Sequence, residues 1–537
     1  MPRPHQLLLS LAAGLGLAAC GSHDATTAPV PAVQGIKAVA GGSVTDTVLS
    51  TPLQALVVEV RGPGGSLAKG SVVRFSVQSP KDSTRRAEST MYVCPLTATT
   101  CGPTTAYPPN SSANVSTDTV DANGHAKTLV RLGTVAGPTY VIVTVPEFGM
   151  TDSVPFTVTP GAARNVTFAT HDVPLLVGGK ATLRAAVTDT YLNPRTDPVS
   201  FTLGSTPGVA TLDAATGTLT AVDLGTVYAY ARAGSAADPA VVRVVPKGRL
   251  LVWDAQNRAI RLINTDGTGQ RALEGSVSSD FGAFPHFSPS AAVVAFHAGS
   301  TDYGGPPGRL VIMDSSGANR REVGLPAGVT YVAYARPLAT GAVLFIGHKP
   351  STGYPSYSNP ASVFSVATDG TVTELAALPN PANTYGGASI SPDGTRVAYE
   401  SVDPNSFYQG TGVQVFTIAT GQTTLVDASG TSPSWSPTSD RVAFLSGTAT
   451  SGGTGGALTI VNADGSGRTS FSSAGSFSPG IAWSPDGAYL LARDANFISS
   501  GLIAVRARDG VSVTLRLPAF GANPYSAFGD YYQPDWH

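Results

Sequence analysis

Histidines and cysteines are the side chains of this sequence whose chemistry is most distinctive, and there are eight histidines and three cysteines among 537 residues. An imidazole can ligate a metal or transfer a proton near neutral pH. The C-terminal half of the chain contains His286, His297, His348 and His537. A catalytic metal needs two or three ligands that converge on one point, and strand alternation does not bring these four together. We therefore expect neither a metal nor another cofactor.

No recognised catalytic motif accompanies these histidines. The sequence lacks a Gly-x-Ser-x-Gly elbow, a His-Glu-x-x-His zinc motif and a Walker A loop. Four aspartates, Asp266, Asp369, Asp464 and Asp509, lie in polar Gly-containing segments. An aspartate in such a segment is explained by hydrogen bonds to the backbone of its own turn. The sequence therefore predicts a protein without enzyme activity.

Cys20 follows a segment with the composition of a secretory signal. Arg3 precedes an apolar stretch over 7–19, which is too short to span a bilayer. This stretch ends in Leu-Ala-Ala-Cys and resembles a bacterial lipobox. The resemblance implies that Cys20 becomes the mature N-terminus and carries a lipid on its thiol. The alternative is an ordinary signal peptide with an incidental cysteine.

The lipobox resemblance places the protein in the bacterial cell envelope. Residues 1–19 are then a lipoprotein signal peptide, and residues 20–33, rich in Pro, Thr and Ala, are a flexible tether. A multi-chain lipid anchors a protein more stably than a single acyl chain. Because no aspartate directly follows Cys20, the resemblance to known sorting signals favours the outer membrane, on either its periplasmic or its surface face.

Cys94 and Cys101 are the remaining cysteines. A secreted protein is exposed to oxidising conditions, so a local disulfide between them is the default expectation. Two cysteines alone cannot form a structural zinc site, and a catalytic thiol would need a nearby histidine. The disulfide would hold together a segment with few apolar residues.

Composition indicates that the elements around these residues are β-strands. Hydrophobic residues make up 42% and charged residues 13% of the chain, and Val, Thr, Tyr and Phe occur in short runs between Gly, Pro, Asn and Asp. This pattern is typical of an all-β protein. A formal net charge of -2 gives no electrostatic signature of nucleic-acid binding.

Two segments resemble bacterial immunoglobulin-like modules. Residues 34–160 contain alternating strands and the phrase Asp-Ala-Asn-Gly at 121–124, whose Asn-Gly pair suits a tight hairpin turn. Their order resembles the invasin/intimin type. Residues 161–246 carry the phrase "VATLDAATGTLTA" and resemble the second bacterial Ig-like class. Such modules usually act as spacers, although some bind receptors, and both resemblances imply a β-sandwich.

Residues 248–537 repeat one phrase six times. An aromatic or apolar residue, followed in most copies by Ser-Pro, opens each copy every 45–56 residues, at Phe287, Tyr334, Ile390, Trp435, Trp483 and Trp536. Polar turns occur six times as well, at 264–269, 314–319, 367–372, 418–423, 462–467 and 507–512. Periods of this length are typical of propeller blades. The phrases resemble the WD40-like repeats of TolB-type propellers.

The last copy breaks off after Trp536, and the first copy lacks its opening strand. We therefore predict a six-bladed β-propeller closed by the C-terminal strand. Each blade has four strands, named a to d in order from the axis to the outside. Closure of this kind removes free sheet edges. The a–b and c–d turns then form one face of the propeller, here called the turn face. The b–c and d–a loops form the opposite face, the loop face.

Aromatic residues are concentrated in the predicted loop-face segments. These rim aromatics are Tyr303, Tyr354, Tyr357, Phe407, Tyr408, Phe497 and Tyr525. Aromatic rings among Gly, Ser, Asn and Pro provide rigid contact area at low entropic cost. We predict that they bind a protein or glycan partner. The alternative is that each ring folds down over its own blade.

The sequence thus predicts a lipid-anchored envelope protein in which Ig-like spacers present a binding propeller. A second hypothesis is a glycan lyase or hydrolase that uses the histidines, because His286 and His537 flank inner-strand positions and could face the central channel. The sequence does not identify the ligand or the oligomeric state.

Overall fold

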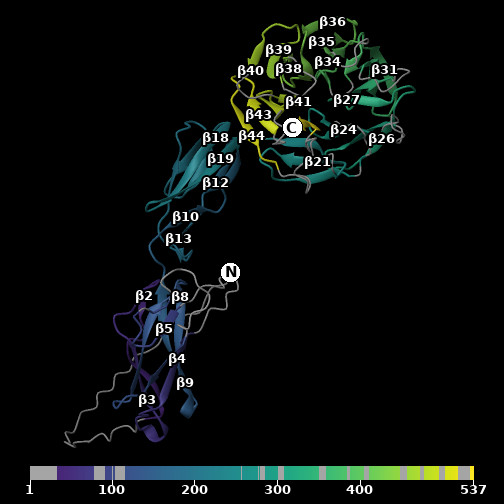
Figure 1. Cartoon of the computed structure of the whole chain (residues 1–537). Coiled ribbons are helices and arrows are strands. Elements are labelled where there is room, and N and C mark those ends of the chain that lie inside the picture. The colour runs from purple at the N-terminus through teal and green to yellow at the C-terminus, as the bar shows by residue number, and fades with distance from the viewer. Residues whose placement is uncertain are drawn as a thin grey trace, which may run out of the picture. The chain divides into compact units, whose positions relative to one another are not determined.

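In the computed structural model, short β-strands follow one another along the chain, and no α-helix occurs among the described residues (Figure 1). The described residues are 33–77, 91–99, 101–102, 115–254, 257–275, 277, 285–299, 308–349, 358–383, 387–403, 410–447, 456–471, 477–494, 502–517 and 532–537. Within these ranges no helix is long and apolar enough to cross a bilayer. The chain is all-β, as predicted.

Contacts divide the chain into two compact units. The first unit comprises the described residues up to Ala162 together with Thr188–Arg195, and the second comprises Ala163–Val187 and Thr196–His537. The segment Thr188–Arg195 therefore belongs to the first unit although it is flanked in sequence by residues of the second. The buried Asn193 fixes it there, since its amide donates to the Thr134 carbonyl and accepts from the Ala136 N–H.

The first unit is a β-sandwich of two sheets. One sheet has the order β1-β3-β7-β5 and the other β2-β9-β8-β4-β6. Their strands are β1 (Gly35–Ala40), β2 (Thr45–Thr47), β3 (Leu56–Arg61), β4 (Val72–Val77), β5 (Met91–Cys94), β6 (Val115–Thr119), β7 (His125–Leu132), β8 (Gly137–Val145) and β9 (Met150–Thr159). Short 3-10 turns occur at η1 (Pro63–Gly65) and η3 (Pro146–Phe148). Inward-facing residues of both sheets, such as Phe75 and Phe156, form one core.

The Asn-Gly turn at 123–124 is tight, but it does not form a hairpin. Gly124 has φ of +81°, and the Asp121 carboxylate accepts from the Asn123 and His125 N–H groups. A Cβ at Gly124 would lie 2.5 Å from a Leu67 methyl carbon. The flanking strands β6 and β7 lie in different sheets. The hairpin expectation is therefore wrong, because the turn connects the two layers of the sandwich.

The second unit begins with another sandwich. One sheet has the order β11-β19-β18-β15, a second has β12-β17-β16, and β10 pairs with β13. The strands are β10 (Asn165–Phe168), β11 (Asp172–Leu176), β12 (Lys180–Thr182), β13 (Ala185–Thr188), β15 (Ser200–Leu203), β16 (Ala210–Asp213), β17 (Thr218–Ala221), β18 (Gly225–Ala233) and β19 (Ala236–Val245). The two-residue strand β14 (Pro194–Arg195) lies in the segment assigned to the first unit. Val227, Ala229 and Val242 are among the fully buried residues of the second core.

Six sheets form a ring from Arg249 onward, and the C-terminus lies near its centre (Figure 1). Blade 1 consists of β45 (Tyr532–Trp536), β20 (Arg249–Asp254), β21 (Ala259–Asn264) and β22 (Arg271–Glu274). Blade 2 consists of β23 (His286–Phe287), β24 (Val293–Ala298), β25 (Arg309–Asp314) and β26 (Arg321–Gly324). Blade 3 consists of β27 (Tyr331–Pro337), β28 (Val343–His348), β30 (Ala361–Val366) and β31 (Val372–Ala377).

The other three blades follow the same plan. Blade 4 consists of β33 (Ala388–Ile390), β34 (Arg396–Val402), β35 (Gly410–Thr417) and β36 (Thr423–Asp427), to which β32 (Ala382–Asn383) and β29 (Ser358–Asn359) add short ladders. Blade 5 consists of β37 (Thr431–Trp435), β38 (Arg441–Ser446), β39 (Ala457–Asn462) and β40 (Thr469–Phe471). Blade 6 consists of β41 (Phe477–Trp483), β42 (Tyr489–Asp494), β43 (Leu502–Arg506) and β44 (Ser512–Leu515).

The C-terminal strand closes the ring. β45 pairs antiparallel with β20, with Leu250 opposite Trp536 and Leu251 opposite Asp535. The His537 N–H also donates to the Arg249 carbonyl at 2.8 Å. The predicted closure and the six-blade arrangement are therefore confirmed.

The residue at the end of each strand a packs between blades. Arg396 lies over the Trp435 ring at 5.0 Å, Arg441 lies over Trp483 at 5.6 Å, and Tyr489 lies 6.3 Å from Trp536. In each pair the first residue begins strand b of one blade and the second ends strand a of the next. Blades 4, 5, 6 and 1 are joined by this repeated contact.

Blade 3 departs from the predicted register. In blade 4, Ile390 ends strand a opposite Val397, while in blade 3 the corresponding pair is Pro337 and Val343. Tyr334 lies three residues earlier, within β27. The assignment of Tyr334 as the opening residue was therefore wrong. Blade 3 has no Ser-Pro turn to mark the end of strand a, and the aromatic residue Tyr334 does not mark it either.

Candidate functional site: the central pocket

The rim aromatics and the anchor lie outside the described residues. This holds for Tyr303, Tyr354, Tyr357, Phe407, Tyr408, Phe497, Tyr525 and Cys20. The strands that lead into the loop face are described, and β29 and β32 form a short ladder there, with Ser358 opposite Asn383. The binding role of the rim aromatics stays a prediction.

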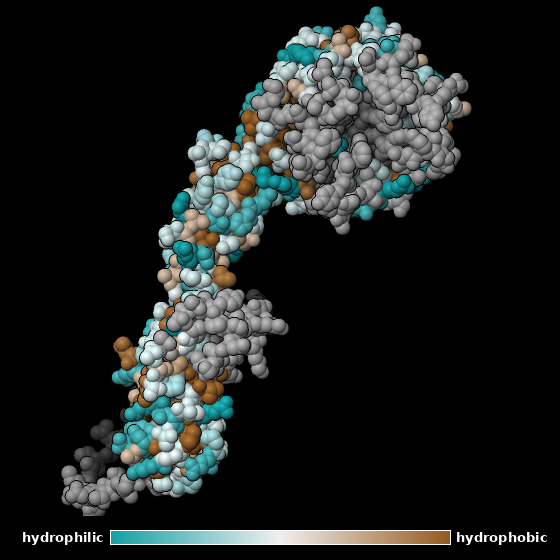
Figure 2. Space-filling model, viewed as in Figure 1, coloured by the Kyte–Doolittle hydropathy of each residue, from teal (hydrophilic) through white to brown (hydrophobic). Residues whose placement is uncertain are grey.

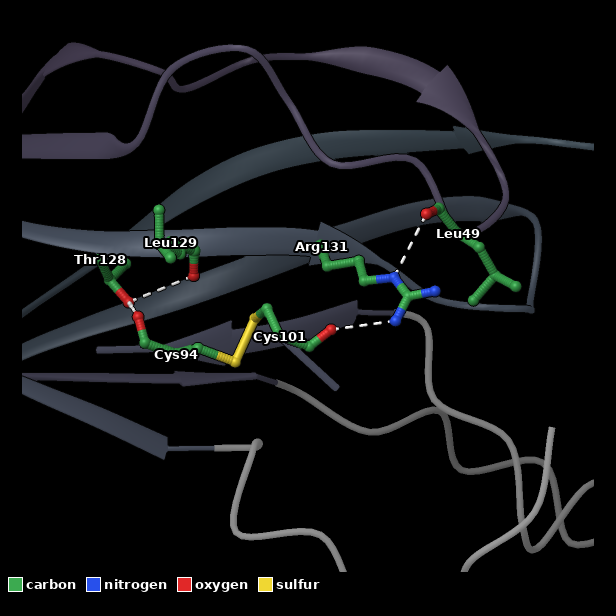
Figure 3. The surroundings of a disulfide bond; sticks show 6 residues. All are labelled: Leu49, Cys94, Cys101, Thr128, Leu129 and Arg131. Atoms are coloured by element: carbon green, nitrogen blue, oxygen red, sulfur yellow. Dashed lines mark hydrogen bonds between the residues drawn. A yellow bond between two sulfur atoms is a disulfide. The ribbon is translucent and has the colours of Figure 1, made fainter. Parts of the chain in front are cut away.

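Cys94 and Cys101 are joined by a disulfide, with their Cα atoms 5.5 Å apart (Figure 3). Cys94 ends β5, and the Thr128 hydroxyl of β7 donates to its carbonyl at 3.0 Å. Arg131 donates to the carbonyls of Cys101 and Leu49 at 3.1 and 3.3 Å (Figure 3). The disulfide and Arg131 therefore fix the segment after β5 against the sandwich, which is a structural role.

The turn aspartates act within their own turns, as predicted. The carboxylates of Asp266, Asp369, Asp464 and Asp509 each accept the N–H of the residue two positions later, at 2.8–3.2 Å. These turns connect strands c and d on the turn face. Arg506 and the Val511 N–H lower the pKa of Asp509 to about 2, which is consistent with a permanently ionised structural carboxylate.

A cavity of about 190 Å³ lies at the turn-face end of the propeller axis, and we call it the central pocket. All six blades line it through the second half of strand a. The residue directly before the end of each strand a lines it in every blade. This inner ring consists of His286, Arg336, Ser389, Ser434, Ala482 and Asp535. Because side chains alternate along a strand, the final residue packs between blades and the preceding one faces the axis.

Asp535 is the anionic group of the central pocket. One carboxylate oxygen accepts the Phe287 N–H at 2.6 Å, and the other lies 3.8 Å from His286 Nδ1. Burial raises the pKa of Asp535, but His286, the Phe287 amide and Arg336 outweigh it and lower the pKa overall. The carboxylate is therefore ionised at neutral pH and attaches blade 1 to blade 2.

Arg336 is the cationic group of the inner ring. Its Nη1 donates to the Ile390 carbonyl at 3.2 Å, and among the described residues its Nε has no hydrogen-bond partner. No described carboxylate lies within ion-pair distance of it. Tyr334 lies beside it in the pocket lining, stacks on the His286 ring at 4.1 Å, and accepts from the Ser389 hydroxyl at 3.5 Å.

The structure separates the four histidines into two pairs. His286 and His537 line the central pocket, and in the described part of the protein the Nε2 of each is buried without a hydrogen-bond partner. Burial lowers the pKa of His537, partly opposed by Asp535. His348 instead ends strand b of blade 3, and His297 lies one residue before the end of strand b of blade 2, both at the loop-face end. The Tyr331 ring lies between them at 5.0 and 6.2 Å. Among the described residues no group of three His, Cys, Asp or Glu could hold a metal.

Comparisons with known proteins find only distant similarities to solved structures. No protein-family model and no curated protein matches the chain. TolB from Acinetobacter baumannii is 12% identical over 63% of this chain and 82% of its own, with a TM-score of 0.39. A TolB candidate from Agrobacterium tumefaciens is 15% identical over 54% and 98%, with a TM-score of 0.36. An oligogalacturonate lyase in complex with manganese is 10% identical over 69% and 89%, with a TM-score of 0.37. Similarities this distant say nothing about the ligand.

Sequence reasoning identified His286 and His537 but missed Arg336 and Asp535. The sequence contains a signal for Asp535, because Asp535 stands directly before Trp536 at the same position of the repeat as Ser434 before Trp435. The sequence hides Arg336, because blade 3 lacks the Ser-Pro turn and its aromatic residue Tyr334 does not end the inner strand. With Pro337 in that position, Arg336 falls on the inner ring.

Proposed function

We propose that the protein is a lipid-anchored binding protein of the bacterial cell envelope, in which Ig-like modules present a propeller that recognises a protein or glycan partner through its loop face. The anchor rests on the lipobox-like sequence at Cys20. The binding role rests on the rim aromatics in the loop-face segments. Neither depends on catalysis.

The observation that carries the proposal is the attachment of the second sandwich to the turn-face end of blade 6. Asp223 of the sandwich accepts from Arg506, which also donates to Asp509 in the c–d turn. Leu224 and Val245 of the sandwich share an apolar cluster with propeller residues such as Leu515. Since the b–c and d–a loops lie at the opposite ends of the strands, this attachment leaves the loop face for a partner.

The rim aromatics can be tested by replacing Tyr354, Tyr357, Phe407 and Tyr408 together with alanine. The probe is the envelope fraction of the source bacterium, and the readout is the yield of cross-linked complex per molecule of tagged protein. We expect the yield to fall at least tenfold while the melting temperature stays unchanged. An unchanged yield contradicts the proposal, and a large loss of stability shows instead that the rings cover their own blades.

The anchor is tested by Cys20→Ser. We expect loss of lipid labelling and release of the protein from the membrane fraction. If the variant stays in the membrane fraction, Cys20 is not the anchor.

A glycan lyase or hydrolase that uses the channel histidines is the second candidate function. One observation favours it, namely that His286, His537 and Asp535 lie in one pocket. An enzyme of this kind would turn over an oligosaccharide and lose turnover in His286→Gln. A metal analysis of the purified protein separates the two functions at the least cost, because stoichiometric metal favours the enzyme.

A further inference from the structure

The central pocket contains polar groups that no described residue satisfies. His286 Nε2, His537 Nε2 and Arg336 Nε are buried, and no described residue provides them with a hydrogen-bond partner. Leaving a buried donor or acceptor unpaired costs free energy, and proteins retain such groups where something else satisfies them. The residues that carry these groups belong to blades 1, 2 and 3 and line one cavity.

The charges of the pocket favour a neutral ligand. Asp535 is ionised, Arg336 is cationic, and burial keeps His537 neutral. Among the described residues the two opposite charges do not form a salt bridge with each other, so each keeps hydrogen-bonding capacity. An anion would be attracted by Arg336 and repelled by Asp535, and a cation would experience the reverse. A hydroxyl group can donate to a carboxylate and accept from a guanidinium, so it suits both.

The other residues that line the pocket suit the C–H face of a sugar ring. Proline residues of the a–b turns surround the opening at Pro289, Pro392, Pro437 and Pro485, and Trp435 and Trp483 lie among them. Such residues pack flat against C–H groups. At roughly 30 Å³ per water molecule, a cavity of about 190 Å³ holds on the order of six waters. This space fits a single sugar ring rather than a long chain.

We propose that the central pocket binds one neutral saccharide unit, with Arg336 donating to and Asp535 accepting from its hydroxyls. Tyr334 completes the polar contacts, together with His286 Nε2 and His537 Nε2, which have no partner among the described residues. The site lies on the turn face and is distinct from the rim aromatics. A test of this saccharide site is therefore independent of a test of the loop-face function.

Ligand-observed NMR and calorimetry on the full mature chain test this proposal. The probes are the methyl glycosides of glucose, galactose and mannose together with N-acetylglucosamine. The charged comparators are the anion glucuronate, the cation glucosamine and the zwitterion alanine. We expect saturable binding of at least one neutral sugar and weaker binding of every comparator. A charged comparator that binds best, or the failure of every neutral sugar to bind, overturns the proposal.

Variants then place the binding in the pocket. Arg336→Gln should weaken affinity at least about tenfold, as expected for loss of a charged hydrogen-bond donor, and Tyr334→Phe should weaken it several-fold. Arg320→Gln is the matched control, because Arg320 pairs with Glu274 and Glu322 on the outer strands of blades 1 and 2 and does not line the pocket. Its affinity should be unchanged, as should that of the quadruple alanine variant of the loop face. Binding that survives both pocket substitutions with unchanged melting overturns the assignment.

Discussion

The sandwich modules and the propeller use the same apolar residue types but bury them differently. In β7 of the first module, buried and partly exposed residues alternate along all eight positions, whereas all six residues of β28 in the propeller are buried. A sandwich sheet has one face toward the core and one toward solvent. Figure 2 shows hydrophobic residues scattered among hydrophilic ones on the described surface of the sandwiches. A propeller sheet is covered on both faces by neighbouring blades.

This difference in burial determines how much stability each region loses when a side chain is removed. Each propeller core cluster combines residues of adjacent blades, as Leu310 of blade 2 and Phe345 of blade 3 do. A blade therefore cannot lose its packing without exposing its neighbours. A sandwich strand can lose an outward-facing residue at little cost. The following predictions test this contrast in order of expected effect.

Deletion of 532–537 should have the largest effect. It removes the inner strand of blade 1 and Trp536, which is 4% exposed and packs with Leu250 and Leu491. Loss of one buried Trp side chain typically costs about 3–5 kcal/mol, against a domain stability of about 5–15 kcal/mol. We expect calorimetry of the full chain to lose the propeller transition while the first sandwich keeps its own. Superimposable melting curves would contradict ring closure.

Truncating one buried aromatic ring of the propeller and one exposed aromatic ring of the second sandwich should give a smaller difference in stability. Phe345→Ala removes a side chain that is 1% exposed and stacks on Phe364 at 4.9 Å, and should cost about 3–5 kcal/mol. Tyr228→Ala in the second sandwich removes a ring that is 52% exposed and should change stability by less than about 0.5 kcal/mol. Chemical denaturation of both variants measures the difference. Equal costs would show that burial does not distinguish the two regions.

The smallest of the three effects is a pH dependence specific to the propeller. Burial, reinforced by Arg309, lowers the pKa of His297 from 6.5 to about 3. Between these values the unfolded chain binds a proton at His297 that the folded chain does not, so stability falls as the pH falls below 6.5. The loss should reach about 2 kcal/mol at pH 5.

His297→Gln is the test variant, because it removes the titrating group and keeps a polar side chain. The free energy of unfolding of the variant should change less between pH 7 and pH 5 than that of the native protein. His537 titrates in both proteins and cancels in the comparison. Parallel pH profiles would rule out His297 as a source of the dependence.

The propeller was predictable because its signals repeat. Trp435 and Trp483 fall at the same point of the same phrase, and the broken phrase at Trp536 indicated closure. The errors arose where a local signal was read alone. The Asn123-Gly124 pair specifies a tight turn but not which sheets it joins, and Tyr334 is not followed by the Ser-Pro turn that fixes the register in most other blades.

The central pocket was only partly predictable. Arg336 and Asp535 are nearly two hundred residues apart in sequence, and neither belongs to a short motif. They meet because a closed ring brings every inner strand to one axis. Alternation along strand a could have identified the inner ring, but only after the register of all six blades was correct. The Nε2 atoms of His286 and His537 lack a partner among the described residues because of side-chain packing, which sequence patterns do not show.

The central functional claim is that the envelope partner binds through the loop face, whereas the central pocket on the turn face holds a single saccharide unit. Site-specific photo-cross-linking in intact cells tests it directly. The photoreactive residue is placed at Tyr354 or Tyr408, in the segments predicted to form the loop face, and at Thr268 or Ser316 in c–d turns of the turn face. The account predicts discrete cross-linked products from both loop positions and none from the turn positions. Products from the turn positions alone would contradict it.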